Sequence, residues 1–122
     1  YSRLTAVDMN TGEHLWWIPT GDTPDRIKNH AALQGVDIGE TGGAGPAISM
    51  VMGDLLVMSD GRRGDSVIHA VNKQTGERLG TVELPVNGQY GMMTYLHNDK
   101  QFVVVQIGGS QYPSSLVALT LP

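Results

Sequence analysis

Short apolar runs separated by glycine-containing turns dominate the pattern of this chain. Leu4–Val7, Ile68–Val71 and Val103–Val105 are examples, and the 16 glycines are spread between such runs. Short apolar runs bounded by Gly, Pro, Asn or Asp are typical of β-strands, and glycine readily takes the positive φ of tight turns. The pattern therefore predicts an all-β chain with many tight turns.

Nine strands are expected from these runs. They are Arg3–Asp8, His14–Pro19, Ala47–Val51, Leu55–Ser59, Ser66–Asn72, Arg78–Leu84, Gly91–Leu96, Gln101–Ile107 and Leu116–Leu121. Gly21–Gly45 is expected to be a long excursion between the second and third strands. Val103–Val105 is a continuous β-branched run, which is typical of a strand buried on both faces. Pro85 is expected to end a strand, because proline cannot donate to a strand ladder.

The chain also repeats itself. Leu4–Asp8 recurs as Ile68–Asn72 and more weakly as Leu116–Thr120, and the Thr-Gly-Glu at Thr11–Glu13 recurs at Thr75–Glu77. The interval between the second and third copies is close to the ~40–50 residues of a four-stranded propeller blade. The first interval is longer because it contains the excursion. The repeat therefore predicts antiparallel four-stranded blades that form part of a β-propeller.

Counting strands within each repeat divides the chain into four parts. Residues 1–20 supply the two outer strands of one blade, 21–45 an insertion loop, 46–85 a full blade, and 86–122 three strands of a closing blade. The second copy departs from the first, with Asn72 and Gly80 where the first has Asp8 and Trp16. In many propellers the outer strand of the last blade comes from the beginning of the chain, and a chain that ends after a third strand fits such a closure.

Composition and charge exclude several classes of function. Charged residues make up 16% of the chain, below the ~25% typical of soluble domains, which fits a surface partly covered by neighbours. The net charge of −4 argues against nucleic acid, and the basic pair Arg62-Arg63 is expected in a Gly/Asp turn. No apolar run approaches the ~20 residues needed to span a membrane. Cysteine is absent, which excludes disulfides and thiolate metal sites.

One stretch near the start carries a recognisable motif. Ala6 and Asp8 lie two apart on one strand, Thr11-Gly12 forms the turn, and Trp16 closes the next strand. The pattern Ala-x-Asp-x-x-Thr-Gly-x-x-x-Trp resembles the tryptophan-docking motif of the PQQ-dependent (quinoprotein) dehydrogenases, which are β-propeller enzymes. In that family the tryptophan packs onto the neighbouring blade. Asp8 is expected to accept hydrogen bonds from the turn amides rather than to act as a general base.

Three further segments extend the resemblance over nearly the whole chain. The first segment comprises Gly88–Tyr95, Lys100–Val105 and Gly108-Gly109. It is similar to the "P-M-T-Y … K-Q-Y-V-V-V … G-G" run of the alcohol and glucose enzymes, with Met92 in place of Pro. Leu116–Pro122 is similar to the closing "L-V-A-L-A-L-P". Gly21–His30 looks like an insertion of one soluble or periplasmic branch. The resemblance implies the C-terminal blades of an eight-bladed ring.

The resemblance also implies a function for the longer protein. It would bind PQQ and calcium at the hub, oxidise an alcohol or sugar by hydride transfer to the quinone, and work in the bacterial periplasm. Its catalytic residues would lie in upstream blades, which would be the partners of this segment. No catalytic residue, metal ligand or cofactor is evident here, so the segment alone is expected to be inactive.

Two glycine-containing loops lead into inner strands and are the candidate cofactor contacts. Gln89, Tyr90 and Gly91 are the better candidates, and Thr41, Gly42 and Gly43 are the second set. Glycine lets backbone approach a ligand closely, and inner strands line the hub. The alternative for both loops is ordinary turn chemistry. The second loop is not a dinucleotide fingerprint, because no helix follows it.

Other polar residues are expected to be structural. The four histidines share no ligand spacing, and Asp22, Asp25 and Asp37 lack the spacing of an EF-hand. Asp25–His30 is expected to form a helical turn with Thr23 as N-cap and Pro24 as the first helical residue.

The sequence is also compatible with two alternative hypotheses about the function. One is a non-catalytic propeller with PQQ-like repeats that serves as a binding scaffold. The other is a small β protein that completes its ring by self-association, because unpaired strand edges invite pairing.

Overall fold

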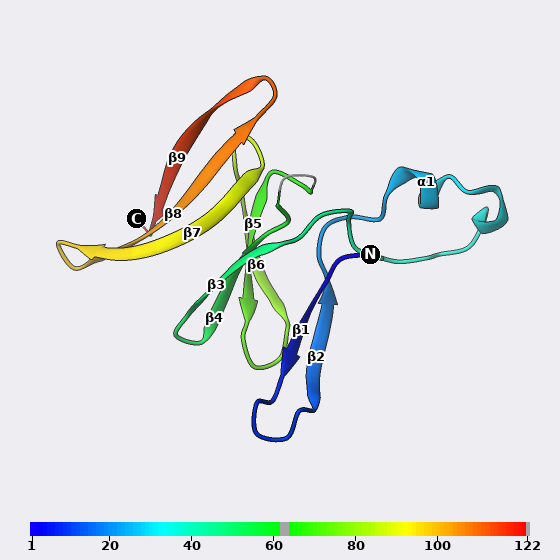
Figure 1. Cartoon of the computed structure of the whole chain (residues 1–122), viewed down its shortest axis with the longest axis horizontal. Helices are drawn as coiled ribbons and strands as arrows, with labels where there is room; N and C mark the ends of the chain where they lie inside the picture. Colours follow the sequence, from blue (N-terminus) through cyan, green and yellow to red (C-terminus); the bar gives the residue numbers. More distant parts are fainter. Residues whose placement is uncertain (62–63, 122) are drawn as a thin grey trace.

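The computed structural model describes residues 1–61 and 64–121, and almost all regular structure in them is antiparallel β-sheet. Three sheets lie side by side in chain order (Figure 1). The expected all-β section of a propeller is therefore confirmed. The basic pair Arg62-Arg63 and the last residue of the closing motif, Pro122, lie outside the described residues.

The sheets contain two, four and three strands. The first sheet is β1 (Arg3–Val7) and β2 (His14–Pro19). The second is β3 (Ile48–Met52), β4 (Leu55–Ser59), β5 (Val67–Asn72) and β6 (Arg78–Glu83). The third is β7 (Gly88–His97), β8 (Lys100–Gly109) and β9 (Tyr112–Thr120). Within each sheet every strand pairs with the next in sequence, so the first sheet is a hairpin and the other two are meanders.

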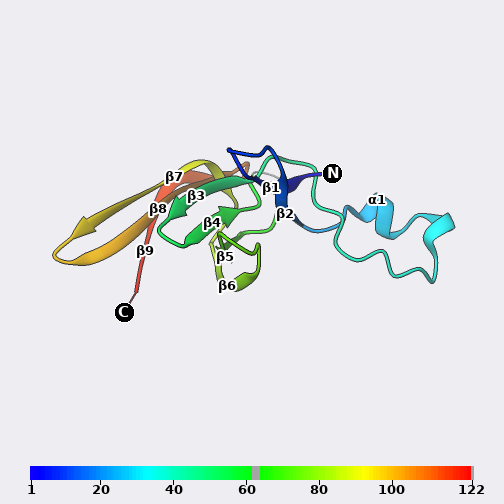
Figure 2. The ribbon, with the colours of Figure 1, turned by 90° about the horizontal axis from the view of Figure 1, so that it is seen from below.

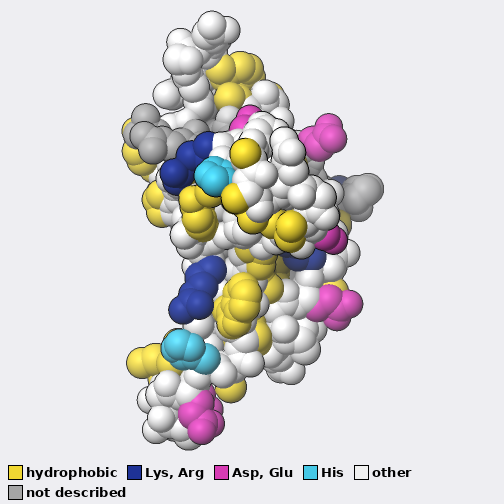
Figure 3. All heavy atoms as spheres, turned by 90° about the vertical axis from the view of Figure 1, so that its right-hand side faces the viewer, with side chains coloured by type: hydrophobic (Ala, Val, Ile, Leu, Met, Phe, Trp, Pro, Cys, Tyr) yellow, Lys and Arg dark blue, Asp and Glu magenta, His cyan; other side chains and the backbone are white. Residues whose placement is uncertain are grey.

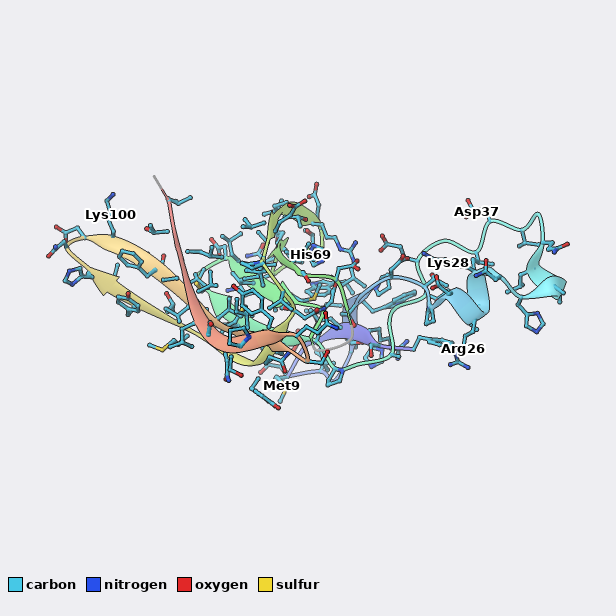
Figure 4. All side chains as sticks on the ribbon, turned by 90° about the horizontal axis from the view of Figure 1, so that it is seen from above. Met9, Arg26, Lys28, Asp37, His69 and Lys100 are labelled. Carbon is cyan, nitrogen blue, oxygen red and sulfur yellow. The ribbon has the colours of Figure 1, made fainter. Side chains whose placement is uncertain are left out.

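The last three strands are longer than the sequence pattern predicts. β7 and β8 stay paired as far as His97 and Lys100, because Asn98 and Asp99 both take positive φ in the turn between them. Asn and Asp tolerate that conformation better than other non-glycine residues. The hairpin tip carrying Lys100 therefore extends beyond β9 (Figures 1 and 4).

The repeated hairpins β1–β2 and β5–β6 share one irregularity. Their registers shift directly after Ala6 and directly after Ala70, and the residues opposite these alanines are Trp16 and Gly80. A shift at the same place in both copies shows that the repeat is structural as well as sequential. Each register shift is a β-bulge, which changes the direction of the strand end that leads into the turn.

The four-stranded sheet packs on both faces. On one face Leu56, Met58 and Val71 pack with Leu4 and Ile18 of the first sheet. On the other face a second cluster joins the four-stranded and three-stranded sheets. Its buried members are Val57, Ile68, Leu84, Val105 and Ile107. Neighbouring residues of β4 thus point to opposite sheets, as the two-residue period of a strand requires.

Burial of the β-branched run in β8 differs from the expectation. Val105 is fully buried, whereas Val103 and Val104 are half-buried. The three-stranded sheet packs against the four-stranded sheet through one face, and no described sheet covers its other face. The β-branched run of β8 is apolar on both faces, but another described sheet covers only one of them.

The insertion between β2 and β3 projects away from the sheets (Figures 1 and 2). It contains α1 (Asp25–Lys28) and a 3₁₀ turn over Ala31–Leu33. The helical turn was predicted, but its cap was not: Pro24 is the N-cap residue and no side chain caps the helix. The hydroxyl of Thr23 is used elsewhere, because it donates to Gly39 O at 3.0 Å and accepts from Thr41 N at 2.9 Å. No helix in the described part of the chain is long and apolar enough to cross a membrane.

Candidate functional site

The candidate site is a hollow where the loops leading into β3 and β7 meet. These two inner strands lie against each other, so their leading loops converge although they are far apart in sequence. The hollow has a volume of about 710 Å³. It is lined by Ala44, Gly45, Pro46, Ala47, Ile48, Gln89 and Tyr90. The residues that bound it are small, apolar or neutral, and its volume falls within the range of small-molecule sites.

The structure brings Gln89 and Tyr90, two of the predicted cofactor contacts, into this hollow. Gln89 is half-buried and its amide nitrogen donates to the carbonyl oxygen of Gly108 on β8. Tyr90 lines the hollow and is 68% exposed. A Cβ atom at Gly91 would have no heavy atom within 4 Å, so the backbone beside Tyr90 is open to close approach.

The second predicted set, Thr41, Gly42 and Gly43, lies in a packed loop beside the hollow rather than among its lining residues. Gly42 has φ +86°, and a Cβ atom there would lie 2.0 Å from the carbonyl oxygen of Ser2. Gly43 accepts from Ser2 N and donates to Thr20 O. These contacts tie the end of the insertion to the first sheet.

A second hollow of about 720 Å³ shares Gln89 and Tyr90 with the first. It lies at the same end of the third sheet, where β7 begins and the turn joins β8 to β9. Its other lining residues are Pro85, Val86, Asn87, Gly108, Gly109, Ser110, Gln111, Tyr112 and Ser114. Sequence reasoning did not identify this turn as part of a site.

A buried polar network between the first two sheets was also missed from the sequence. Asp60 is 5% exposed, and its Oδ1 atom accepts from Gly21 N at 3.0 Å. Its Oδ2 atom lies 3.3 Å from Nε2 of His69, whose Nδ1 atom lies 3.1 Å from Oγ1 of Thr81. No local pattern signals this network, because its members come from β5, β6 and two separate loops.

Charged groups in the insertion pair with each other at the surface. Lys28 of α1 forms an ion pair with Asp22, and Figure 4 places Lys28 well away from His69. The hydrogen bond from Lys28 lowers the pKa of the Asp22 carboxyl, and the same bond raises the pKa of the Lys28 ammonium. Arg78 of β6 binds Glu40 at 3.0 Å and so joins the insertion to the four-stranded sheet.

Metal ligands do not gather in the described part of the chain. No group of three or more His, Cys, Asp or Glu side chains there could hold a metal ion. On the face shown in Figure 3, acidic and basic side chains are scattered among neutral and apolar ones. The described residues therefore do not offer the acidic cluster that would hold a calcium ion.

Three adjacent antiparallel sheets, in which the inner strands β3 and β7 lie in contact with a hollow where their leading loops meet, define a section of a β-propeller. The family model for the glucose/ethanol/alcohol dehydrogenase β-propeller domain, the PQQ family, matches residues 1–103. The chain therefore belongs to this family, as its motifs indicated.

Curated relatives support the same assignment. The chain is 35% identical to quinoprotein glucose dehydrogenase A of Acinetobacter calcoaceticus and 31% identical to the glycerol dehydrogenase large subunit of Gluconobacter thailandicus. It is 30% identical to a probable quinate dehydrogenase (quinone) of Xanthomonas campestris pv. juglandis. All of the chain aligns in each case, but it spans only 15%, 17% and 16% of these proteins.

Proposed function

We propose that this chain forms part of a PQQ-dependent dehydrogenase that oxidises an alcohol or a sugar, and that it supplies one wall of the cofactor chamber. One observation carries the proposal: the leading loops of two inner strands converge on a neutral hollow that contains Gln89 and Tyr90. Family membership and the quinoprotein relatives support PQQ as the cofactor. When bound, PQQ supplies the oxidant that accepts hydride from the substrate carbon.

In this proposal the residues of this chain bind and orient the cofactor and take no chemical part in the reaction. Gln89 is held by Gly108, so its remaining amide oxygen is fixed in position as a hydrogen-bond acceptor. The exposed ring of Tyr90 offers a flat apolar surface with a polar end. The open backbone at Gly91 allows a planar group to approach closely. Thr41, Gly42 and Gly43 stay candidates for a cofactor contact at the edge of the chamber.

The calcium ion and the catalytic base belong, in this proposal, to other parts of the full-length protein. The described residues contain no acidic cluster that could hold the ion. The upstream blades would be the partners of this segment, and its proposed location is the bacterial periplasm, as the family resemblance implies.

The test uses the complete gene product, freed of cofactor and reconstituted with PQQ and Ca²⁺. Reduction of an electron-acceptor dye is measured with a panel of alcohols and sugars. PQQ-dependent reduction is the expected result. Tyr90→Ala is expected to weaken PQQ binding about 5- to 50-fold, as the loss of one well-packed aromatic contact would. Tyr95→Ala, at the opposite end of β7, is the matched control and should bind PQQ like the unchanged protein.

Two results would contradict the proposal in different ways. Absence of dye reduction with every substrate, together with absence of PQQ binding, would favour the non-catalytic scaffold. PQQ-dependent activity that Tyr90→Ala and Tyr95→Ala change equally would keep the dehydrogenase but remove this hollow from its cofactor chamber.

A further inference from the structure

We propose that a hollow between the second and third sheets is a binding site for a neutral planar aromatic molecule of the indole type. This inter-sheet hollow has a volume of about 760 Å³, and its lining residues come from both sheets and from the residue that follows β9. It shares no lining residue with the two hollows at Gln89 and Tyr90. The inference therefore goes beyond the proposed function and does not depend on it.

The internal repeat identifies the place that the hollow occupies. In the first sheet Ala6 lies opposite Trp16, and in the second sheet Ala70 lies opposite Gly80, with the same register shift directly after each alanine. Both Ala70 and Gly80 line the inter-sheet hollow. A Cβ atom at Gly80 would have no heavy atom within 4 Å. The hollow therefore stands on the second sheet where the Trp16 ring stands on the first.

The hollow also holds the counterpart of the group that pairs with the Trp16 ring. The indole Nε1 atom of Trp16 donates to the carbonyl oxygen of Lys73, the first residue after β5. Leu116–Thr120 repeats Ile68–Asn72, so the corresponding first residue after β9 is Leu121, which lines the hollow. The carbonyl oxygen of Leu121 accepts one hydrogen bond, at 3.3 Å, from the threonine before it. Its second lone pair is available to the N–H group of a ligand.

The floor of the hollow suits an apolar ring. Val57 and Ile68 are buried there, with 6% and 5% of their surfaces exposed. Met52, Val103 and Leu119 pack against the same cluster and also line the hollow. Because these side chains already pack together, the floor exists before any ligand binds. A flat ring that covers it removes apolar surface from water on both sides of the contact, which is favourable.

Charge favours a neutral ring over an ionic one. Asp99 and Lys100 are the charged residues among the described residues that line the hollow. They have opposite signs, and both are exposed at the tip of the β7–β8 hairpin (Figure 4). An ionised group placed on the apolar floor would lose water without gaining a buried partner, which is costly. A neutral aromatic ring with one N–H donor is therefore the occupant that fits both the floor and the Leu121 carbonyl.

An occupant of this kind would join the second and third sheets as Trp16 joins the first and second. A molecule that binds the folded state and not the unfolded chain stabilises the folded state by mass action. Indole is therefore expected to raise the midpoint of urea unfolding of the complete gene product as its concentration rises.

The first test measures indole binding to the complete gene product by calorimetry and by NMR of labelled methyl groups. Saturable binding that shifts the methyl signals of Val57 and Ile68 is expected. The methyl signals of Leu56 and Val71 are the internal control, because these residues pack on the opposite face of the same sheet and should not shift. Shifts at Leu56 and Val71 without shifts at Val57 and Ile68 would overturn the inference. Absence of saturable binding, as expected if another segment of the complete protein already fills the hollow, would also overturn it.

The second test places the missing ring in the hollow covalently. Gly80→Trp is expected to abolish saturable indole binding and to raise the midpoint of urea unfolding. Leu79→Trp is the matched control, because Leu79 is the neighbouring residue of β6, is 53% exposed and points to the opposite face of the sheet. Equal indole binding by the two folded variants would overturn the assignment of the site. If Gly80→Trp does not fold, the methyl shifts of the unchanged protein decide the question.

Discussion

The indole Nε1 atom of Trp16 donates a hydrogen bond to the backbone carbonyl oxygen of Lys73, at 3.1 Å. This bond crosses from the first sheet to the β5–β6 turn of the second. The indole ring also covers Gly76 in that turn, where a Cβ atom would lie 2.8 Å from Cε3 of Trp16. At the corresponding place on the second sheet stands Gly80, and a Cβ atom there would have no neighbour within 4 Å. The same inter-sheet contact is therefore not available from Gly80.

Replacement of Trp16 by alanine is expected to destabilise the packing of the first sheet on the second. The change removes the indole contact with Gly76 and the bond to Lys73, at a cost of about 2–3 kcal/mol for a half-buried ring. The measurement is urea unfolding of the complete gene product. Trp17→Ala is the control, because Trp17 is 59% exposed and should cost less than about 1 kcal/mol. Equal losses in the two variants would contradict a docking role for Trp16.

A comparison of alanine substitutions at Gly12 and Gly76 separates the cost of backbone strain from the cost of a clash with the Trp16 ring. Both glycines have nearly the same φ, +78° and +77°, so alanine at either position costs about 1–2 kcal/mol in the left-handed region. Only at Gly76 would the new methyl group meet the Trp16 ring. Gly76→Ala is expected to lower the free energy of unfolding by about 1–3 kcal/mol more than Gly12→Ala does. If Trp16→Ala does not reduce this difference, the indole ring is not its cause.

Removal of the Asp60 carboxylate is expected to weaken the junction of the first two sheets. Asp60→Ala leaves the amide of Gly21 and the ring of His69 without their buried partner. Unpaired buried donors cost about 1–3 kcal/mol each, so a loss of about 2–4 kcal/mol is expected in urea unfolding. Asp65→Ala, at an exposed site in the same loop, should change stability by less than about 0.5 kcal/mol. A neutral effect of Asp60→Ala would show that the network does not support the junction.

The ion pair in the insertion predicts a pH response. Because Lys28 lowers the pKa of Asp22 below 3.8, the bond favours the folded insertion above that pH, and the benefit is lost as pH falls through the folded-state pKa. Lys28→Ala should return the Asp22 pKa towards 3.8, whereas Lys28→Arg should keep it low. The measurement is an NMR titration of the carboxyl carbon of Asp22 in segmentally labelled protein. An Asp22 pKa that Lys28→Ala leaves unchanged would contradict the pairing.

Local structure followed from the sequence because it depends on neighbouring residues. Asp8 Oδ1 accepts from Asn10 N and Thr11 N, and Asn72 Oδ1 accepts from Gln74 N and Thr75 N in the repeated turn. These bonds close within a few residues, so a short motif determines them. The strand order and the repeated hairpin were predictable for the same reason. The capping of α1 was not, because the hydroxyl of Thr23 binds Gly39 and Thr41, residues well separated from it in sequence.

The sequence by itself determined the strands, the turns and the family of this protein, because each depends on residues within short segments of the chain. Only the tertiary structure decided which distant residues meet. The packing of β3 against β7 places Ala44–Ile48 beside Gln89 and Tyr90, and the packing of the first two sheets buries Asp60 with His69. No local preference determines such contacts, because they arise from burying the apolar faces of separate sheets against one another.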